Sequence, residues 1–412
     1  MRCGLLGRRL GHSHSPRIHA LFADYAFELF EREPEGLNAF FKEQAFDGLM
    51  VTIPYKRDVM RYCARIDPAA ARIGALNALA RESDGSLTGY NTDYFGFLSL
   101  ADHAKIDLGV NKALVLGTGG TSRTVSLALE DRGAKEVLQV SREGTLNYAN
   151  IGRHADAELI VNTTPVGMSP DITSAPVELS MFPSLKGVID VVYNPLRTKL
   201  VLDARRLSLP AAGGLYMLVA QAKAAAELFC RTPIPEELVL KAFQTMSRAL
   251  ENIVLVGMPG SGKTAIGRRL AEKMGREFYD TDARVEALAG KSIPEIFNEN
   301  GEPAFRALER RAVKELAGHT KIVLATGGGA PLDIGNRDAL RSSGYIVCLQ
   351  RELSALAREG RPLSADPAAL EKMAEVRLPI YRDYADLCIK NEGAIDAIVD
   401  AILEEYNAHP CN

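Results

Sequence analysis

A glycine-rich segment at residues 257–264 places the strongest constraint on how this chain can fold. It fits the pattern G-x-x-x-x-G-K-[ST], which binds phosphates between a strand and a helix. An apolar, strand-like run at 253–256 precedes it, and a helical pattern follows Lys263. We expect Gly260, Ser261 and Gly262 to cradle phosphates, Lys263 to reach the β- and γ-phosphates, and Thr264 to ligate Mg²⁺. The alternative is a chance glycine-rich turn.

Such a loop opens its domain, so the first 250 or so residues must form something else. Apolar strand-like runs alternate with helical patterns in both parts, which predicts parallel sheets covered by helices. The runs lie at 48–52, 112–117, 137–140, 159–162, 187–192, 253–256, 277–279, 322–325 and 345–349. A helical pattern that ends at Leu250 indicates a short linker near residues 249–252.

The composition is that of a globular protein, with 47% hydrophobic and 25% charged residues. A net charge of −3 gives no electrostatic case for nucleic acid as a partner. No apolar run approaches the roughly 18 residues of a membrane span, and residues 1–7 resemble a strand more than a signal peptide. The six cysteines are scattered, which favours reduced thiols in a cytoplasmic protein over disulfides or a zinc site.

A second glycine-rich loop follows the strand-like run at 112–117. Gly117, Gly119 and Gly120 would let the backbone approach a pyrophosphate, although a non-binding turn is the alternative. The next predicted strand ends at Ser141 and Arg142, which suit the 2′-phosphate of NADP. The adjacent Glu143 weakens that preference, because an acidic residue at this place favours NAD.

Polar residues follow other predicted strands of the first part. Ser13 and Ser15 could face a polar ligand, or Ser15 could cap a helix that has Pro16 in its first turn. Lys56, just past a buried strand, suits acid–base work, with a solvated lysine as the alternative. Asp93 could hold a carboxylate close to Lys56, or its segment could form an Asx-turn or helix cap.

Together these segments resemble shikimate dehydrogenase over the first 240 or so residues. The matching segments are 11–16, 51–56, 73–77, 89–93, 117–123, 162–168, 190–198 and 214–221. The resemblance implies that Ser13 and Ser15 bind the substrate carboxylate, and that ring hydroxyls are bound by Thr52, Asn77, Asp93 and Gln221. It also implies that Lys56 and Asp93 form the acid–base pair, and that NADP(H) is bound by Gly117, Gly119, Gly120, Arg123, Ser141, Arg142 and Met217.

Two positions depart from the family pattern. Met50 stands where the family usually has Asn, and Ala78 stands where Thr usually follows Asn77. Both flank matching residues, so we expect them to tune the site without abolishing it.

The second part carries its own polar candidates after the phosphate loop. Asp280 and Asp282 could hold Mg²⁺ and orient an acceptor hydroxyl, or they could simply cap a helix. Arg306 and Arg377 suit bidentate carboxylate binding, with a solvated helix face as the alternative for Arg306. Residues 327–329 are three glycines that permit backbone contact with a small ligand, although a bare turn is possible.

From residue 252 onward the combination resembles shikimate kinase. The resemblance implies that Lys263 and Thr264 serve ATP and Mg²⁺, with Asp280 assisting the metal, and that Arg361 closes onto the phosphates from a lid. Shikimate would be bound by Asp282, Arg306, Gly328 and Arg377. Asp282 would also orient the 3-hydroxyl.

We therefore expect an α/β chain with four parts: a substrate domain (1–100 and 213–240), a Rossmann-like NADP domain (101–212), a helical linker (241–251) and a P-loop domain (252–412). The expected function is reduction of 3-dehydroshikimate with NADPH, followed by phosphorylation of shikimate by ATP. The alternatives are a quinate-type dehydrogenase fused to a kinase, and a ligand sensor that has lost catalysis in one half.

Overall fold

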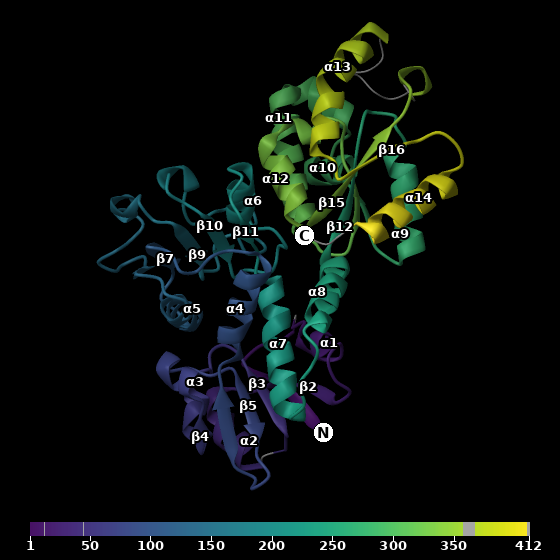
Figure 1. Ribbon diagram of the computed structural model, residues 1–412. Coiled ribbons are helices and arrows are strands. Elements are labelled where there is room, and N and C mark those ends of the chain that lie inside the picture. The colour runs from purple at the N-terminus through teal and green to yellow at the C-terminus, as the bar shows by residue number, and fades with distance from the viewer. Residues whose placement is uncertain (12, 44, 357–366, 410–412) are drawn as a thin grey trace. The chain divides into compact units, whose positions relative to one another are not determined.

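The computed structural model describes residues 1–11, 13–43, 45–356 and 367–409. Contacts between Cα atoms divide the chain into two compact units (Figure 1). Unit 1 contains Met1–Val166, Ala175–Tyr193 and Asp203–Met246, and unit 2 contains Gly167–Ser174, Asn194–Leu202 and Ser247–Asn412. The main boundary lies within the expected linker 241–251, whereas the finer division of the first part stays a prediction.

The first sheet of unit 1 has the strand order β2-β1-β3-β5-β6-β4. β5 runs antiparallel to both β3 and β6, so the expectation of purely parallel sheets is wrong here. The reason is the short connection between β5 and β6, closed by the bond from Glu82 N to Ser86 O (2.8 Å), because so short a turn joins only antiparallel strands. The strands are β1 (Arg2–Gly7), β2 (Ala26–Glu31), β3 (Gly48–Val51), β4 (Arg65–Ile66), β5 (Ala78–Arg81) and β6 (Leu87–Tyr90).

Both faces of this sheet are covered by apolar side chains. On one face Leu49 and Leu79 pack with Phe40 and Phe41 of α2 (Leu37–Glu43). On the other face lies α7 (Leu215–Cys230), whose Phe229 packs with the side chains of β1, β3 and β5. Figure 1 shows α7 alongside α4 (Thr92–His103), and these two helices also make extensive contact. The short helix α1 (Ser15–His19) lies near α7, where His19 stacks with Phe229, whereas Ala70 of α3 (Pro68–Ile73) belongs to the core on the α2 side.

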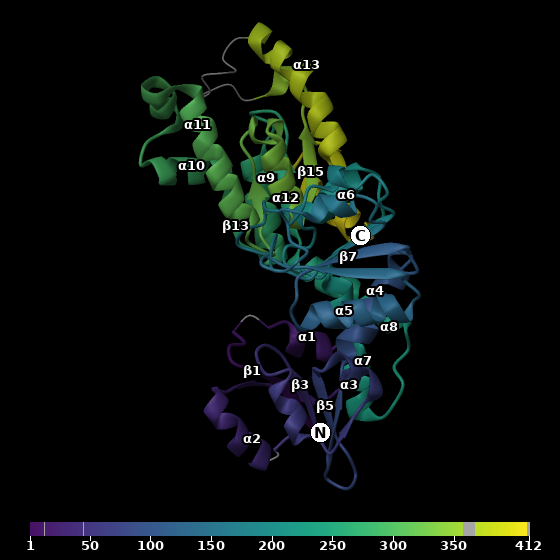
Figure 2. The same ribbon diagram turned by 90° about the vertical axis from the view of Figure 1, so that its left-hand side faces the viewer.

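The second sheet of unit 1 is parallel, with the order β11-β10-β9-β7-β8. Figure 2 shows α5 (Gly120–Asp131) and α4 on the same side of β7. The strands are β7 (Lys112–Leu116), β8 (Glu136–Val140), β9 (Leu159–Asn162), β10 (Gly187–Asp190) and β11 (Ala211–Ala212). β7, β9 and the Val188–Ile189 part of β10 are almost wholly buried, as expected of a sheet covered on both faces. α6 (Lys199–Arg206) crosses the unit boundary after Leu202.

Unit 2 is built on a parallel sheet with the order β13-β14-β12-β15-β16. Its central strand β12 (Asn252–Val256) leads into the phosphate loop, as the sequence predicted. The other strands are β13 (Phe278–Asp280), β14 (Val323–Ala325), β15 (Gly344–Gln350) and β16 (Leu387–Lys390). β16 was not expected from the sequence, because its alternating exposure marks an edge strand without a continuous apolar run.

Helices cover both faces of the unit 2 sheet. Figure 1 shows α9 (Lys263–Met274) and α14 (Ile395–Ala408) on one side of β12, with Ile266 and Ile402 in their shared core. On the other side Val313 of α11 (Ile293–Ala317), Leu340 of α12 (Ile334–Ser343) and Tyr381 of α13 (Pro367–Tyr384) form the second core. The short α10 (Thr281–Ala289) follows β13 directly.

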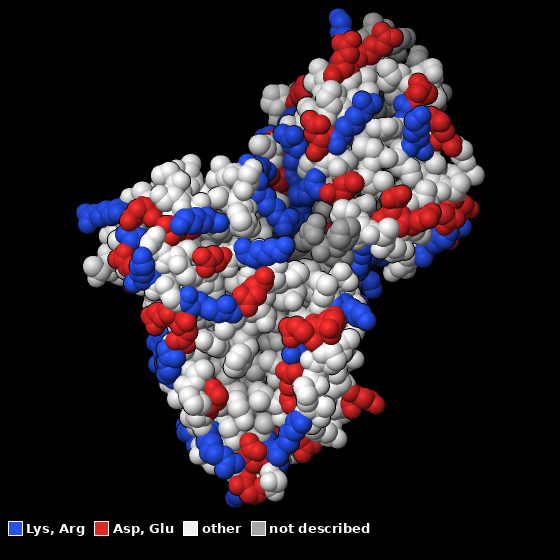
Figure 3. Space-filling model, in the orientation of Figure 1, with Lys and Arg blue, Asp and Glu red and all other residues white. Residues whose placement is uncertain are grey.

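One helix belongs to both units. α8 (Glu237–Leu250) passes the boundary between Met246 and Ser247, and only Glu251 separates its end from β12. No helix in the described ranges is long and apolar enough to cross a membrane. Cys3, Cys63, Cys230, Cys348 and Cys388 are free thiols. Figure 3 shows acidic and basic side chains interspersed on the face that it draws.

Candidate active sites

A cavity of about 430 Å³ in unit 1 lies where β1 and β3 end. The ends of parallel strands are where small-molecule sites commonly form. All seven residues that the sequence analysis assigned to the dehydrogenase substrate line this cavity: Ser13, Ser15, Thr52, Lys56, Asn77, Asp93 and Gln221. The structure therefore brings together side chains that are up to about 200 positions apart in the sequence. Sequence reasoning did not single out Arg9, Tyr193 and Leu218, which also line the cavity.

Lys56 and Asp93 form a close ion pair in the cavity. Lys56 Nζ lies 2.6 Å from Asp93 Oδ2, and the two side chains are 21% and 14% exposed. Asp93 lies in the first turn of α4, whose cap is Asn91: its side chain accepts a hydrogen bond from Tyr94 N (3.2 Å). Asn91 thus caps the helix while Asp93 holds the lysine, so both sequence interpretations of this segment apply, each to a different residue.

The alternative interpretation of Ser15 as a helix cap is wrong. α1 begins at Ser15 with His14 at the N-cap position and no side-chain cap bond, although Pro16 does lie in the first turn. Ser13 takes the local role, because its Oγ accepts a hydrogen bond from Ser15 N at 3.2 Å. The Ser13 hydroxyl hydrogen and the Ser15 hydroxyl remain available to the cavity that both residues line.

Asn77 and Gln221 form a buried amide pair. Asn77 is 2% and Gln221 6% exposed, and Asn77 Nδ2 donates to Gln221 Oε1 at 3.4 Å. Thr92 N donates to Asn77 Oδ1 (2.7 Å), and Gln221 Nε2 donates to Leu218 O (2.8 Å). These bonds fix which way each amide faces, so that hydroxyl groups of a ligand would meet a defined set of donors and acceptors.

The glycine-rich loop after β7 has the form expected of a dinucleotide site. Gly117 has φ 113°, and a Cβ there would lie 2.7 Å from Thr163 Oγ1. At Gly119 and Gly120 an added Cβ would meet no atom within 4 Å, so protein packing does not explain these two glycines. Open space at the N-terminus of α5 is what a pyrophosphate needs, and the loop therefore fits NADP.

The other residues expected at NADP lie close to this loop in the fold or on α7. Arg123 is exposed on α5, and Ser141 and Arg142 follow the end of β8. Neither arginine has an ion-pair partner among the described residues. Met217 is 6% exposed within α7 and does not line the substrate cavity.

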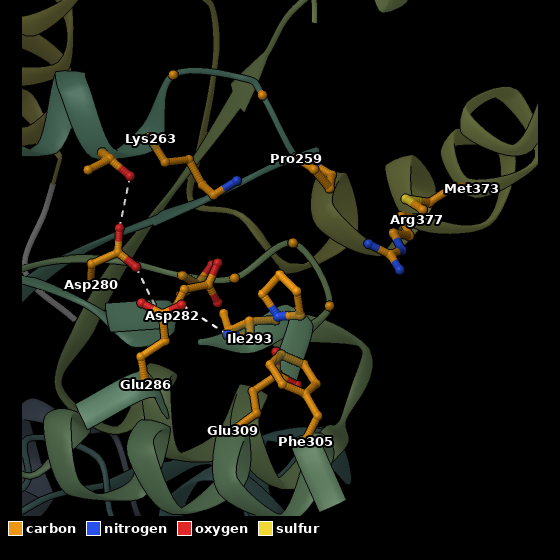
Figure 4. Close-up of a pocket in the computed structure, with 18 of the residues that line it drawn as sticks. Pro259, Lys263, Asp280, Asp282, Glu286, Ile293, Phe305, Glu309, Met373 and Arg377 are labelled. Carbon is orange, nitrogen blue, oxygen red and sulfur yellow. Dashed lines mark hydrogen bonds between the residues drawn. The ribbon is translucent and has the colours of Figure 1, made fainter. Parts of the chain in front are cut away.

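A pocket of about 520 Å³ in unit 2 surrounds the phosphate loop (Figure 4). Nine of the residues expected at the kinase site line it: Gly260, Gly262, Lys263, Thr264, Asp280, Asp282, Arg306, Gly328 and Arg377. Ser261 is a wholly buried residue of the loop, and its Oγ has no hydrogen-bond partner among the described residues. Arg361 lies outside the described residues. Figure 4 shows the Lys263 ammonium and the Arg377 guanidinium turned toward the same pocket.

The side chain of Lys263 is hydrogen-bonded to backbone carbonyl groups of its own loop. Lys263 Nζ donates to Gly257 O (2.9 Å) and Met258 O (3.0 Å), and the residue is 8% exposed. Gly262 has φ 95° and directly precedes α9, a conformation that favours glycine. Asn391, just after β16, supports the loop from behind, because its Nδ2 donates to Ser261 O at 2.7 Å.

Thr264 and Asp280 meet at the edge of the pocket. Thr264 Oγ1 donates to Asp280 Oδ2 (2.8 Å), and Asp280 Oδ1 accepts from Asp282 N (2.9 Å), which caps α10. The capping interpretation of Asp280 is thus also correct. One hydroxyl and one carboxylate are few protein ligands, and no group of three or more His, Cys, Asp or Glu residues that could hold a metal occurs in the described ranges. The pair nonetheless fits Mg²⁺, which usually binds one or two carboxylates together with substrate phosphates.

Asp282 occupies a place that disfavours its charge. Burial and the neighbouring Asp280 carboxylate raise the pKa of Asp282 to about 6, although Lys263 opposes the shift. An added Cβ at Gly327 would lie 2.3 Å from Asp282 Oδ1, so this glycine allows the carboxylate to approach the loop after β14. Gly327 therefore has a packing reason in addition to the binding role expected of the three glycines.

Arg306 is engaged by two carboxylates of its own helix. Its guanidinium bonds Glu302 Oε1 (2.9 and 3.1 Å) and Glu309 Oε2 (2.8 Å). Glu309 is 1% exposed, its Oε1 has no hydrogen-bond partner within the described ranges, and burial raises its pKa. The sequence analysis did not assign a role to Glu309. Its spacing of three from Arg306 on one helix was the available signal.

A second cavity of about 420 Å³ adjoins the phosphate loop and shares Gly262, Ala265 and Arg351 with the first pocket. Arg351 follows β15, and Asn391 and Gly393 follow β16. The sequence analysis did not name Arg351, Asn391 or Gly393, because they lie in short polar segments without a motif.

The loop after β7 and the paired lysine and aspartate define a dinucleotide-linked dehydrogenase, and unit 2 defines a P-loop kinase. The chain belongs to the shikimate dehydrogenase family and carries a shikimate kinase domain at its C-terminal end. Residues 5–79 match the family model described as the shikimate dehydrogenase substrate binding domain, and residues 259–407 match that of shikimate kinase.

Similar proteins support this placement. Shikimate dehydrogenase (NADP(+)) of Clostridium beijerinckii is 37% identical over 245 residues, which are 55% of this chain and 90% of that protein. A chorismate mutase/shikimate 5-dehydrogenase fusion protein from Clostridium acetobutylicum is similar in structure, with a TM-score of 0.56 and 34% identity over 60% of this chain and 96% of that one. So is shikimate 5-dehydrogenase of Thermus thermophilus in complex with NADP(H) and shikimate (TM-score 0.54, 30% identity, 60% and 99% covered).

Proposed function

We propose that this chain carries out two successive reactions on one carbon skeleton. Unit 1 reduces 3-dehydroshikimate to shikimate with NADPH, and the kinase domain phosphorylates shikimate at its 3-hydroxyl with ATP. The observation that carries the proposal is the Lys56–Asp93 pair, 2.6 Å apart in one cavity with the Ser13, Asn77 and Gln221 side chains. The product of the first reaction is the acceptor of the second, so the two assignments support each other.

In the dehydrogenase, NADPH supplies the hydride when it is bound. Reduction of a ketone builds negative charge on its oxygen, which a proton donor must neutralise. Lys56, held by its ion pair with Asp93, is placed to donate a proton from Nζ to that oxygen. Thr52, Asn77 and Gln221 orient the ring through its hydroxyls, and Ser13 and Ser15 hold its carboxylate.

The cofactor would be held by the loop of Gly117, Gly119 and Gly120 at the N-terminus of α5. Arg123 and Arg142 are the cations available to a 2′-phosphate, because neither is engaged in an ion pair within the described ranges. Glu143 follows Arg142 and is also exposed, so the preference for NADP over NAD depends on the balance between these neighbours.

In the kinase, Gly260, Gly262 and Lys263 hold the phosphates of ATP, and Thr264 and Asp280 hold Mg²⁺, which offsets phosphate charge when it is bound. Asp282 accepts a hydrogen bond from the attacking hydroxyl and aims it. The shikimate carboxylate pairs with Arg377 and Arg306, and Glu302 must yield part of the Arg306 guanidinium for this. Arg351 and the cavity beside Asn391 suit the nucleoside of ATP.

Steady-state turnover of the purified chain tests the proposal directly. One assay follows NADPH oxidation with 3-dehydroshikimate, and another follows ADP formation with shikimate. Quinate in place of shikimate tests the first rival, a quinate-type dehydrogenase. Tight binding of shikimate without turnover in either assay would favour the second rival, a ligand sensor. The cytoplasmic location stays a prediction.

A further inference from the structure

The cavity of unit 1 carries an excess positive charge. Its lining holds three charged side chains within the described residues: Arg9, Lys56 and Asp93. Lys56 and Asp93 are bonded at 2.6 Å, so their charges cancel. Arg9 is exposed and has no ion-pair or hydrogen-bond partner in the described part of the chain. The lining therefore has a net charge of about +1, all of it from Arg9.

Arg9 directly precedes a turn that leads to Ser13, and both residues line the cavity. Ser13 N donates to Leu10 O at 2.9 Å, which closes a turn directly after Arg9. Leu10 N in turn donates to Glu31 Oε1 at 2.6 Å, which anchors the turn to the end of β2. Glu31 does not line the cavity. The Glu31 carboxylate thus stabilises the backbone beside Arg9 and forms no ion pair with its guanidinium.

The neighbouring Arg8 behaves differently. Its Nε lies 2.8 Å from Glu33 Oε2, and it does not line the cavity. The two adjacent arginines therefore allow a comparison: Arg8 forms an ion pair outside the cavity, whereas Arg9 lines the cavity without an ion-pair partner among the described residues.

We propose that the Arg9 guanidinium pairs with the substrate carboxylate and makes the dehydrogenase site selective for an anionic ring. The inference rests on the proposed dehydrogenase function. Ser13 and Ser15 are neutral donors, whereas an arginine paired with a carboxylate can form two parallel hydrogen bonds, which add energy and geometric specificity. Lys56 cannot take this role, because Asp93 holds it where the ketone is reduced. A planar guanidinium matches the two oxygens of a carboxylate.

Substitution of Arg9 combined with a neutral substrate tests the proposal. With NADP⁺ and shikimate, Arg9→Ala should raise KM about tenfold and leave kcat nearly unchanged, whereas Arg9→Lys should retain part of the affinity. With the methyl ester of shikimate, which has no carboxylate charge, the wild type and Arg9→Ala should show the same KM. Arg8→Ala is the matched control and should behave as the wild type with both substrates.

The outcomes distinguish failure of the proposed dehydrogenase function from failure of the role of Arg9. If the wild type does not oxidise shikimate at all, the proposed function itself fails. If the wild type is active but Arg9→Ala leaves KM unchanged, or raises it equally for the acid and the ester, only the role of Arg9 is overturned. An unchanged kcat and an unchanged KM for NADP⁺ show that unit 1 of each variant is folded.

Discussion

Met50 and Ala78 are direct partners across the antiparallel strands β3 and β5. They are also the two positions that depart from the family pattern, and both are buried, at 4% and 0% exposure. Side chains opposite each other on neighbouring strands are about 4.5–5.5 Å apart at Cβ, so their volumes are coupled. A large residue facing a small one replaces the Asn and Thr that are usual in the family. The departures are therefore one linked change beside the substrate cavity, whose lining includes Met50.

This pairing predicts that the stability effects of restoring the two residues usual in the family, Asn in place of Met50 and Thr in place of Ala78, depend on each other. Ala78→Thr alone should destabilise unit 1 by about 1–3 kcal/mol, because Ala78 is fully buried in the core that it shares with Met50. Met50→Asn in the same chain should recover at least about 0.5 kcal/mol of that loss. Urea unfolding of the two single variants and the double variant measures the coupling. Strictly additive effects would mean that the two side chains do not sense each other.

The second prediction concerns proton donation by Lys56. Lys56→Ala should lower the dehydrogenase kcat by about 10²-fold or more with little change in substrate KM, because the donor acts on the transition state. Kinase turnover in the same chain is the internal control, and Lys42→Ala, on the exposed surface of α2, is the matched lysine. Reduction at nearly the wild-type rate would remove Lys56 from the mechanism.

The third prediction concerns cofactor preference. Arg142 has no acidic partner within the described residues and follows β8, where a 2′-phosphate is expected. Arg142→Ala should raise KM for NADPH much more than KM for NADH, and Glu143→Ala should have the opposite bias. Initial rates with both cofactors decide the matter. Equal effects of Arg142→Ala on the two would show that this side chain does not sense the phosphate.

The fourth prediction follows from the raised pKa of Asp282, about 6 in the folded chain against an ordinary value of 3.8. The proposed role needs the carboxylate ionised, so the kinase kcat/KM for shikimate should fall as pH drops below about 6. Asp282→Asn should lower kcat/KM at least about 10²-fold at pH 7.5 while ATP still binds. Circular dichroism of residues 237–412 over the same pH range controls for unfolding, and a flat kinase profile down to pH 5 would contradict the role.

The same shift makes a separate statement about stability. A buried acid with a raised pKa binds more protons when folded than when unfolded, so its contribution to stability falls as pH rises from about 4 to about 6. A shift of about two pKa units corresponds to roughly 3 kcal/mol, and part of that should be recovered by a neutral amide. Asp282→Asn should therefore be more stable than the wild type at pH 7.5, and the difference should shrink toward pH 4.5 in thermal unfolding.

The sequence predicted the dehydrogenase and kinase sites better than the sheets that carry them. Motif residues at strand ends converge because parallel strands present their carboxyl ends together, and so Lys56 met Asp93 as expected. Strand pairing is set by contacts far apart in the sequence, which no local pattern records. The antiparallel β5 and the pairing of Met50 with Ala78 are of this kind.

The sequence also did not reveal which residues are the partners of long charged side chains. Arg306 was expected to bind a ligand carboxylate, yet its guanidinium already forms ion pairs with Glu302 and Glu309. Burial decides this, because a guanidinium taken out of water needs charge compensation even before a ligand arrives. Arg9 was overlooked for the converse reason: nothing in the sequence distinguishes it from Arg8, and only the fold shows which of the two lines the cavity.

The last prediction concerns α8, which contributes to the core of each unit. In unit 1 the ring of Phe243 lies 5.4 Å from that of Tyr216. In unit 2 the guanidinium of Arg248 lies 4.2 Å from the ring of Tyr406, and Arg248 O accepts a hydrogen bond from Arg276 (3.0 Å). A cut at the end of this helix therefore leaves one fragment without part of its packing.

We expect three fragments to behave differently. Residues 1–250 should reduce 3-dehydroshikimate, and residues 237–412, which keep all of α8, should phosphorylate shikimate. Residues 251–412 should be less stable than 237–412 by about 1–3 kcal/mol, because they lack Leu250 and the cation–π contact of Arg248. Arg248→Ala in residues 237–412 isolates that contact, and Arg268→Ala, whose guanidinium lies 5.0 Å from the Phe278 ring, is the comparison. Equal stability of the two kinase fragments would show that α8 contributes nothing to unit 2. The two active fragments can also be mixed, and the appearance of shikimate 3-phosphate timed against the intact chain at equal concentration. A lag in the mixture alone would mean that fusion of the two parts matters kinetically. Identical time courses would mean that shikimate diffuses between two independent enzymes.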